Sequence, residues 1–417
     1  MPAFYETDVN KCRSEKNTPK QSTKKTTEPM KRHNQTNMKV LFALTLVHFT
    51  GDFYSAFTTP LFPAFMDKLN LTLAQVGLIA GVNRFLSFIV QPVAGYLADR
   101  YQGRAIILGG LLMAVVFIPL SGIAGSYGML MLFIALGSVG SSLFHPSVAG
   151  MIPLYSGNRK GFSMSVFNTG GTLAFAVGPF FITAVVAAWG LEAMPVTMAI
   201  GLAVMVYLWV AVPSPKSEGM ASLGLIGTLK KQFGTVWKSI FLIWLVMVLR
   251  AVVGQSFMTF MPVLLVSRGY SLVSGGLMIT LFTLAGTASG LMAGYLADRA
   301  GARPIFLVSH LLMTPALLVM LSLSGSWIYG GVFMAGFFVL ATLPLGVTLA
   351  QELAPGGRSM VSSLMMGLAY GLGGAVAPVV GKLADLYSVA TVLWAVSFIP
   401  LVTVPLILMF PRLKHSR

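Results

Sequence analysis

Gly95-Tyr96-Leu97-Ala98-Asp99-Arg100 occurs twice in this chain, since the same six residues return as Gly294-Tyr295-Leu296-Ala297-Asp298-Arg299. The offset between the copies is 199 residues (294 − 95), and it continues without a gap on both sides. Unrelated apolar helices would not keep charged loop residues aligned in this way. The sequence therefore predicts two copies of one structural unit, an architecture found in many membrane transporters. Further pairs at this offset are Pro63 with Pro262, Arg104 with Arg303, Arg159 with Arg358 and Pro179 with Pro378.

The composition is that of a membrane protein. Hydrophobic residues make up 56% of the 417 residues and charged residues 10%, with a mean hydropathy of +0.80. No soluble core could bury this much apolar surface. A helix needs about 20 apolar residues to cross the roughly 30 Å hydrocarbon layer, and continuous rather than alternating apolar runs favour helices over a barrel. The twelve predicted spans are 39–64, 72–98, 104–123, 127–150, 161–188, 191–212, 238–265, 271–297, 303–323, 327–350, 359–384 and 388–411.

The net charge of +16 is distributed unevenly. With the N-terminus inside, 23 of the 28 Lys and Arg residues fall on the cytoplasmic side or at its helix ends. This asymmetry follows the positive-inside rule, so we expect a protein of the inner (plasma) membrane with both termini in the cytoplasm. The basic charge is thus a topology signal, and no nucleic-acid partner is predicted.

The polar segments divide the chain into five parts. We predict a disordered basic cytoplasmic tail at 1–38, a six-helix bundle at 39–212, a cytoplasmic linker with a short amphipathic helix at 213–237, a second six-helix bundle at 238–412 and a cytoplasmic C-terminus at 413–417. The predicted fold class is an all-α membrane protein with twelve transmembrane helices in two pseudo-symmetric bundles. The tail has no apolar signal region, and translation could also start at Met30 or Met38.

The first span carries His48 and Asp52, which are four residues apart and share one helical face. Asp52 is the only acidic residue that these spans place near mid-membrane. A carboxylate there costs about 2.5–3.5 kcal/mol on insertion scales and usually faces a cavity. We predict that Asp52, with His48 beside it, carries a coupling proton. The alternative is a structural ion pair between two helices.

Arg84 lies near mid-depth in the second span, with Gln91 two helical turns further along the same face. Because arginine keeps its charge in proteins, we predict an Asp52–Arg84 pair that holds Asp52 ionised until something competes for the arginine. A purely structural pair is the alternative. Arg84 and Gln91 are both predicted to bind substrate.

The second half does not repeat this chemistry, since the 199-residue offset aligns Asp52 with Ala251. Proton handling is therefore predicted in the N-terminal half. Arg250 and Gln255 in the seventh span are predicted to bind substrate, with Arg250 as the second cavity cation unless it points to a loop.

Two polar residues of the N-terminal half complete the predicted substrate site. His145 precedes Pro146 in the fourth span, where proline should break or kink the helix. A histidine there either titrates near neutral pH or bonds a freed carbonyl. Asn168 in the fifth span precedes Gly170-Gly171 and is predicted to hydrogen-bond within the cavity.

The repeated hexapeptide, with a basic residue before the next apolar helix, resembles the loop 2–3 signature of the major facilitator superfamily. The resemblance implies a transporter whose motif aspartate holds the cytoplasmic side shut when the cavity faces outward. We predict a contact of Asp99 with Arg358 and its symmetric counterpart. That counterpart joins Asp298 with Arg159; the alternative is that these charges only fix topology. The predicted cytoplasmic gate comprises Gly95, Asp99, Arg100, Arg104, Arg159, Gly294, Asp298, Arg299, Arg303 and Arg358.

Several segments of the N-terminal half resemble the fosmidomycin-resistance branch of this superfamily. The resemblance implies a proton-driven exporter of drugs. The matching segments are His48-x-x-x-Asp52, Leu71-Thr72 with Gln75-Val76-Gly77, Gln91-Pro92, Gly140 to Pro146, Ser165 to Gly171, and Gly178-Pro179.

The function predicted from the sequence is proton-coupled secondary active transport, with export of a small organic anion or drug by alternating access. The alternatives are a proton symporter that imports a small organic or inorganic anion, and a non-transporting sensor or assembly factor. No enzyme, cofactor or metal is predicted, because Gly381-Lys382 lacks the rest of a phosphate loop and no nucleophile is paired with a base. The expected partners are a small-molecule substrate, protons and the lipid bilayer, with the protein as a monomer.

Overall fold

The structure is a computed structural model that describes residues 36–100, 104–214, 236–354 and 363–411. Every regular element within these ranges is helical, which confirms the predicted fold class. Residues 1–35, 215–235 and 412–417 lie outside the described ranges. The predictions made for the tail, the amphipathic linker helix and the C-terminus therefore stay predictions.

The N-terminal half follows the first six predicted spans. Short 3₁₀ segments extend or precede three of its long helices. The elements are α1 (Met38–Ser55), η1 (Thr59–Leu61), α2 (Phe62–Leu69), α3 (Leu73–Arg100), α4 (Arg104–Leu120), η2 (Ser121–Ile123), α5 (Tyr127–Tyr155), α6 (Lys160–Trp189), η3 (Leu191–Thr197) and α7 (Met198–Ala211).

The C-terminal half follows the remaining six spans, several of them divided. Within the described residues, 11 helical stretches are long and apolar enough to cross a membrane. The predicted span 359–384 is not among them; residues 359–362 lie outside the described ranges, and the rest of the span forms η5, α15 and most of α16. The elements are α9 (Trp237–Ser267), α10 (Leu272–Ala300), α11 (Ala302–Ser322), α12 (Trp327–Leu340), α13 (Leu343–Leu353), the π-helix η5 (Ser363–Leu368), α15 (Ala369–Ala375), α16 (Ala377–Tyr387), α17 (Val389–Val396) and α18 (Ile399–Leu408).

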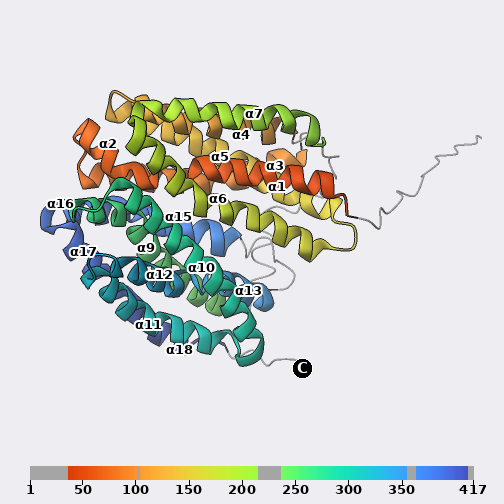
Figure 1. Cartoon of the computed structure of the whole chain (residues 1–417). Coiled ribbons are helices and arrows are strands. Elements are labelled where there is room, and N and C mark those ends of the chain that lie inside the picture. The colour runs from red at the N-terminus through yellow and green to blue at the C-terminus, as the bar shows by residue number, and fades with distance from the viewer. Residues whose placement is uncertain (1–35, 101–103, 215–235, 355–362, 412–417) are drawn as a thin grey trace, which may run out of the picture.

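Figure 1 shows the helices of the N-terminal half gathered above those of the C-terminal half. We call the end of the molecule at which α1 begins and α18 ends the terminal face, and the opposite end the far face. Asn37 N–H donates to the Tyr155 carbonyl at 2.9 Å, which places the start of α1 beside the end of α5. Arg303 donates to the Leu408 carbonyl and joins α11 to the end of α18 in the same way.

Of the two outcomes predicted for Pro146 in the fourth span, a break or a kink, the break does not occur. Helix α5 runs from Tyr127 to Tyr155 with Pro146 inside it, so the helix does not end at His145. The missing proline N–H removes one hydrogen bond, and packing on α4 and α3 holds the helix together. His145 therefore lies on a continuous helix that also carries the polar residues before it.

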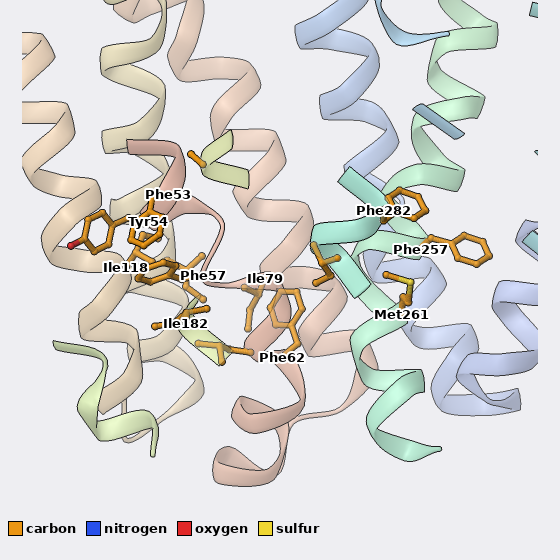
Figure 2. Packing of buried hydrophobic residues seen from close by; sticks show 14 of the residues in the cluster. Phe53, Tyr54, Phe57, Phe62, Ile79, Ile118, Ile182, Phe257, Met261 and Phe282 are labelled. Carbon is orange, nitrogen blue, oxygen red and sulfur yellow. The ribbon is translucent and has the colours of Figure 1, made fainter. Parts of the chain in front are cut away.

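The largest buried apolar cluster joins the two halves. It includes Phe53, Phe57 and Phe62 on one side and Phe257 and Phe282 on the other (Figure 2). A second cluster contains residues of the C-terminal half alone, between Ile240 and Phe410. The apolar core is therefore shared between the halves in one region and belongs to a single half in the other.

Tyr54 fixes the helix that carries the site. Its hydroxyl donates to the Thr197 carbonyl at 2.5 Å and accepts from the Gly201 N–H at 2.9 Å. Both hydrogen bonds are buried, and they hold α1 against η3 and α7. The backbone around Asp52, two residues earlier, is thereby set in position.

Candidate functional site

A cavity of about 280 Å³ lies between the two halves. Its lining includes ten residues with polar side chains from α1, η1, α3, α5 and α15. A more open hollow of about 470 Å³ lies at the far face around Arg268, with no buried ionisable cluster. The central cavity is therefore the candidate site, and its polar residues are Asp52, Ser55, Thr59, Asn83, Arg84, Gln91, Ser138, Ser141, His145 and Tyr370.

Asp52 lies between two histidines. His48, one turn earlier on α1, places Nε2 3.2 Å from Asp52 Oδ2. His145 on α5 places Nε2 2.9 Å from Asp52 Oδ1. The distance between His145 and Asp52 is that of an ion pair, but Asp52 Oδ1 has no hydrogen-bond partner of good geometry. The attraction between the two side chains is therefore mainly electrostatic. This finding corrects the predicted Asp52–Arg84 pair, and His145 is part of the Asp52 cluster.

Two glycines create the space for this cluster. A Cβ on Gly171 of α6 would lie 2.5 Å from the His48 ring and 2.7 Å from Asp52 Oδ2. A Cβ on Gly51 would overlap the Phe144 ring, which packs on α1 and brings the adjacent His145 to Asp52. Glycine at these positions is therefore required for the three ionisable side chains to meet.

Both histidine rings are oriented by backbone carbonyls. His48 Nδ1 lies 2.9 Å from the Phe167 carbonyl, and His145 Nδ1 lies 2.7 Å from the Ser141 carbonyl. A carbonyl can only accept, so the hydrogen is assigned to Nδ1 in each ring. Each Nε2 then faces a carboxylate oxygen of Asp52 and attracts it only when a proton lies between them. The cluster is thus built to hold protons.

The same three residues are the one group in the described ranges that could hold a metal ion. The candidate ligand atoms of His48, Asp52 and His145 lie within 4.8 Å of one another. Protons on the ring nitrogens are sufficient to account for the 2.9 Å and 3.2 Å separations. The absence of a metal stays a prediction.

Arg84 reaches across to the other half rather than to Asp52. Its Nε donates to Gln255 Oε1 on α9 at 3.2 Å. Its aliphatic stem packs on Gly374 of α15, where an added Cβ would lie 2.6 Å from Arg84 Cβ and Cγ. Within the described residues Arg84 forms no ion pair with an acid. A guanidinium without an acidic partner therefore lines the cavity.

Arg250 does not line this cavity. The side chain is 2% exposed, and its Nη1 donates to the Val339 carbonyl of α12 at 2.9 Å. The guanidinium also lies over the Tyr370 ring, 5.6 Å from its centroid. Arg250 is thus buried within the C-terminal half, behind a cavity residue. The prediction that it faces the cavity directly was wrong for this conformation.

The other predicted substrate-binding residues occupy different places. Gln91 lines the cavity, whereas Gln255 is buried and serves as the acceptor for Arg84. Asn168 has an exposed side chain and does not line the cavity. It lies two helical turns from Phe175, which does line the cavity, on the same face of α6.

The two halves are in contact at the far face. Asp385 of α16 accepts from the Leu73 N–H at 2.8 Å and the Ala74 N–H at 2.9 Å, so it caps the start of α3. Thr280 of α10 donates to the Ala176 carbonyl of α6 at 2.6 Å. A Cβ on Gly276 would meet the Pro179 carbonyl at 2.6 Å. These cross-half contacts close the far face.

The terminal face shows no such closure in the described residues. Open space surrounds Gly294, and Asp298 and Arg159 are exposed and form no ion pair with each other. The predicted Asp298–Arg159 contact is therefore not made in this conformation. The predicted Asp99–Arg358 contact involves side chains outside the description, as do the predicted gate roles of Gly95 and Arg100. These calls stay predictions.

The remaining gate arginines make local contacts. Arg104 lies over the Trp209 ring at 5.6 Å from its centroid, and Arg299 lies over Tyr295 at 4.3 Å. Arg303 bonds the Leu408 carbonyl. Each contact lies within one half, so the gate role of these residues stays a prediction.

Sequence reasoning missed Tyr370 and Asp385. The glycine-rich run from Tyr370 to Gly374 is a signal of close helix packing that could have drawn attention to Tyr370. Thr72 and Gln75 form a capping box with hydrogen bonds of 2.9 and 3.2 Å. The start of α3 could therefore be predicted from the spacing of these two residues in the sequence. The sequence gives no sign that an aspartate 312 residues away completes that cap.

Comparison with known proteins gives consistent matches. The model of the Major Facilitator Superfamily matches residues 41–378. The fosmidomycin resistance protein of Escherichia coli (strain K12) is 27% identical over 388 residues, covering 92% of this chain and 95% of that protein. A probable nitrate/nitrite antiporter of Thermus thermophilus is 29% identical over 272 residues, 60% of each chain. A similar fold is found in a bacterial homolog of the human lysosomal transporter Spinster, which was solved in an inward-facing and occupied conformation. The TM-score is 0.76 at 16% sequence identity, and the match covers 89% of this chain and 96% of that one.

Proposed function

The chain belongs to the Major Facilitator Superfamily, and on that premise we propose that it is a proton-coupled secondary active transporter that exports a small organic anion or drug by alternating access. It is a multi-pass protein of the plasma membrane and a transporter rather than an enzyme. The fosmidomycin resistance protein among its relatives favours export and a phosphonate-like substrate.

The observation that carries the proposal is that the Asp52–His145 pair and Arg84 line one cavity. Asp52 Oδ1 and His145 Nε2 lie 2.9 Å apart there, and Arg84 forms no ion pair with an acid among the described residues. A substrate in a cavity of about 280 Å³ must therefore contact both. Occupation by substrate and by protons is then coupled, which is the requirement for secondary active transport.

The conformation supports the alternating-access part of the proposal. The far face is closed by Asp385 and by the α6–α10 contacts, whereas Gly294 at the terminal face has open space around it. The positive-inside distribution assigns the terminal face to the cytoplasm. In this assignment the cavity faces the cytoplasm and is ready to take substrate from inside the cell.

Electrostatics favours import by proton symport as a second candidate. An anion at Arg84 and a proton on the Asp52 cluster attract each other, so each increases the affinity for the other. Cooperative binding of this kind suits symport, whereas export in exchange for protons requires that substrate and protons exclude each other within the small cavity.

Transport in oriented vesicles tests the proposal. Inside-out vesicles with an acidic interior should accumulate fosmidomycin when they come from expressing cells, and vesicles from non-expressing cells should not. Right-side-out vesicles that accumulate fosmidomycin or nitrate from an acidic exterior would support symport instead. If no phosphonate, inorganic anion or lipophilic cation moves in response to the pH gradient, the transporter proposal fails and a sensor or assembly factor becomes the better reading.

A further inference from the structure

Two adjacent glycines allow helix α15 to pack closely on both halves of the protein. A Cβ on Gly373 would lie 2.5 Å from the Ala251 Cβ of α9, in its own half. A Cβ on Gly374 would lie 2.6 Å from the Arg84 side chain of α3, in the other half. The position of α15 is therefore fixed against both Arg84 and the residue that follows Arg250.

Tyr370 lies one helical turn before Gly374, on the side of α15 that faces Arg84. It lines the cavity together with Gly367 and Gly371. The π-helix η5 ends at Leu368, directly before α15, and such segments occur frequently at functional sites. Tyr370 thus supplies the cavity with a hydroxyl from the C-terminal half.

Arg250 lies behind this ring as an uncompensated cation. Within the described residues no acid forms an ion pair with it, and its Nε and Nη2 have no hydrogen-bond partner. Its one hydrogen bond goes to Val339 in the last turn of α12, where the helix dipole favours a positive charge. The face of the Tyr370 ring attracts the guanidinium at 5.6 Å.

We propose that Tyr370 binds the acidic group of the substrate opposite Arg84, and that Arg250 is a positioning residue that acts through the Tyr370 ring. A cation on one face of a phenol withdraws electron density, so the hydroxyl becomes a stronger hydrogen-bond donor. The N-terminal half then contributes a guanidinium to the anion and the C-terminal half a polarised hydroxyl. This inference rests on the proposed function only in taking the substrate to carry an acidic group.

Ligand-induced stabilisation of the purified full-length protein tests the inference without transport. The probes are phenylphosphonate and benzoate, paired with the uncharged dimethyl phenylphosphonate and methyl benzoate. A ligand that binds only the folded state raises the Tm, so the wild type should be stabilised by the acids more than by the esters. Tyr370→Phe should weaken acid binding about tenfold, as expected for one hydrogen bond to a charged group. Arg250→Met should have a similar effect, and ester binding should change little.

The double variant separates positioning from independent action. If Arg250 acts through Tyr370, Tyr370→Phe with Arg250→Met should lose about tenfold rather than about a hundredfold. Arg250→Lys should recover part of the loss, because it restores a cation at the ring. Matched controls are Tyr387→Phe and Arg268→Met, both exposed at the far face.

Each contrary outcome is informative. A wild type with no preference for the acids would overturn the inference, as would additive effects in the double variant. A lower Tm without ligand in Arg250→Met, with acid binding unchanged, would assign Arg250 a purely structural role. Proton-driven flux that depends on Asp52, combined with unchanged acid binding in both variants, would reject this inference and leave the proposed function intact. Acid binding that is weakened in both variants, without any proton-driven flux in the wild type, would reject the proposed function and leave this inference intact.

Discussion

The two halves of the protein repeat one backbone plan at an offset of 199 residues, yet they bury opposite chemistry. In the N-terminal half, Asp52 is flanked by His48 and His145, so charges of both signs are balanced within one cluster. In the C-terminal half, Arg250 is buried with no acidic partner among the described residues. The duplication preserved the helices, while the halves diverged into one that buries a carboxylate between two histidines and one that buries an arginine without an acidic partner among the described residues.

The divergence can be traced to two pairs of equivalent positions. Arg250 corresponds to Gly51 (250 − 199), and Leu343 corresponds to Phe144 (343 − 199). The Phe144 ring packs over Gly51, whereas Leu343 is smaller and the Arg250 side chain extends to Val339. A glycine thus admits the histidine-bearing helix in one half, and an arginine fills the equivalent site in the other.

Asp52→Asn should have the largest effect, because it removes the only buried carboxylate of the N-terminal cluster. A difference of two pH units supplies about 2.7 kcal/mol per proton, enough for about hundredfold accumulation. The variant should accumulate nothing against a gradient and still equilibrate substrate, as measured in vesicles. The matched control is Asp67→Asn, an exposed aspartate on α2. Full uphill transport by Asp52→Asn would remove the distinction between the halves.

His145→Gln should produce the next largest effect, on pH dependence. The amide can donate to Asp52 without titrating, whereas histidine titrates between about pH 5 and 8. Wild-type flux should fall as the pH rises, because the cluster loses the protons that join His145 to Asp52. The variant should show a shallower decline in the same flux assay.

His310→Gln provides the comparison in the other half. His310 is buried, with Nδ1 2.9 Å from the Phe306 carbonyl and no partner at Nε2. Its substitution should leave the slope of flux against pH unchanged. An equal change of slope in His310→Gln and His145→Gln would show that proton handling is not confined to the N-terminal half.

Asp385→Asn should shift the conformational balance by a moderate amount. The change removes the negative charge from an exposed helix start and replaces one of the two accepting oxygens with an amide nitrogen, a loss of about 0.3–1 kcal/mol or about two- to fivefold in population. Cavity exposure at the far face should rise accordingly. The measurement is labelling of Ser55→Cys in a Cys12→Ser background by an impermeant maleimide added from the far face. Labelling equal to that of the wild type would mean that the α6–α10 contacts alone close this face.

Asp298→Asn should have the smallest effect, about twofold, since exposed ion pairs contribute little. Asp298 forms no ion pair among the described residues in the present conformation, so we expect only the state closed at the terminal face to be weakened. Labelling of Ser55→Cys from the terminal face should rise slightly. Exchanging the charges of Asp298 and Arg159 should restore the wild-type rate, and failure of the exchange would leave the motif with a topological role.

Hydropathy and the internal repeat were sufficient to predict the membrane helices, because span length depends only on bilayer thickness. The i,i+4 spacing also predicted the His48–Asp52 contact correctly. The His145–Asp52 contact could not be predicted in this way, since it depends on how α5 packs across Gly51 and Phe144.

Two errors have simpler physical causes. Arg250 and Gln255 are five residues apart, about 140° around a helix, so both could not point into one cavity. The acceptor for Arg84 proved to be Gln255, since α3 and α9 meet across the boundary between the halves. The predicted contacts of the motif aspartates require the two halves to meet at the terminal face, an arrangement that sequence periodicity does not describe, and these contacts stay predictions.

The cap on α3 also bears on how the protein is made. Its acceptor, Asp385, lies 312 residues after Leu73 and is synthesised long after the helix that it caps. A nascent chain that has inserted only its first six spans carries an unfinished helix start, with two N–H groups facing water. This part of the far-face closure can form only after the last quarter of the chain has entered the bilayer. The α6–α10 contacts can form earlier, so the far face is completed in two stages, of which the second coincides with the end of synthesis.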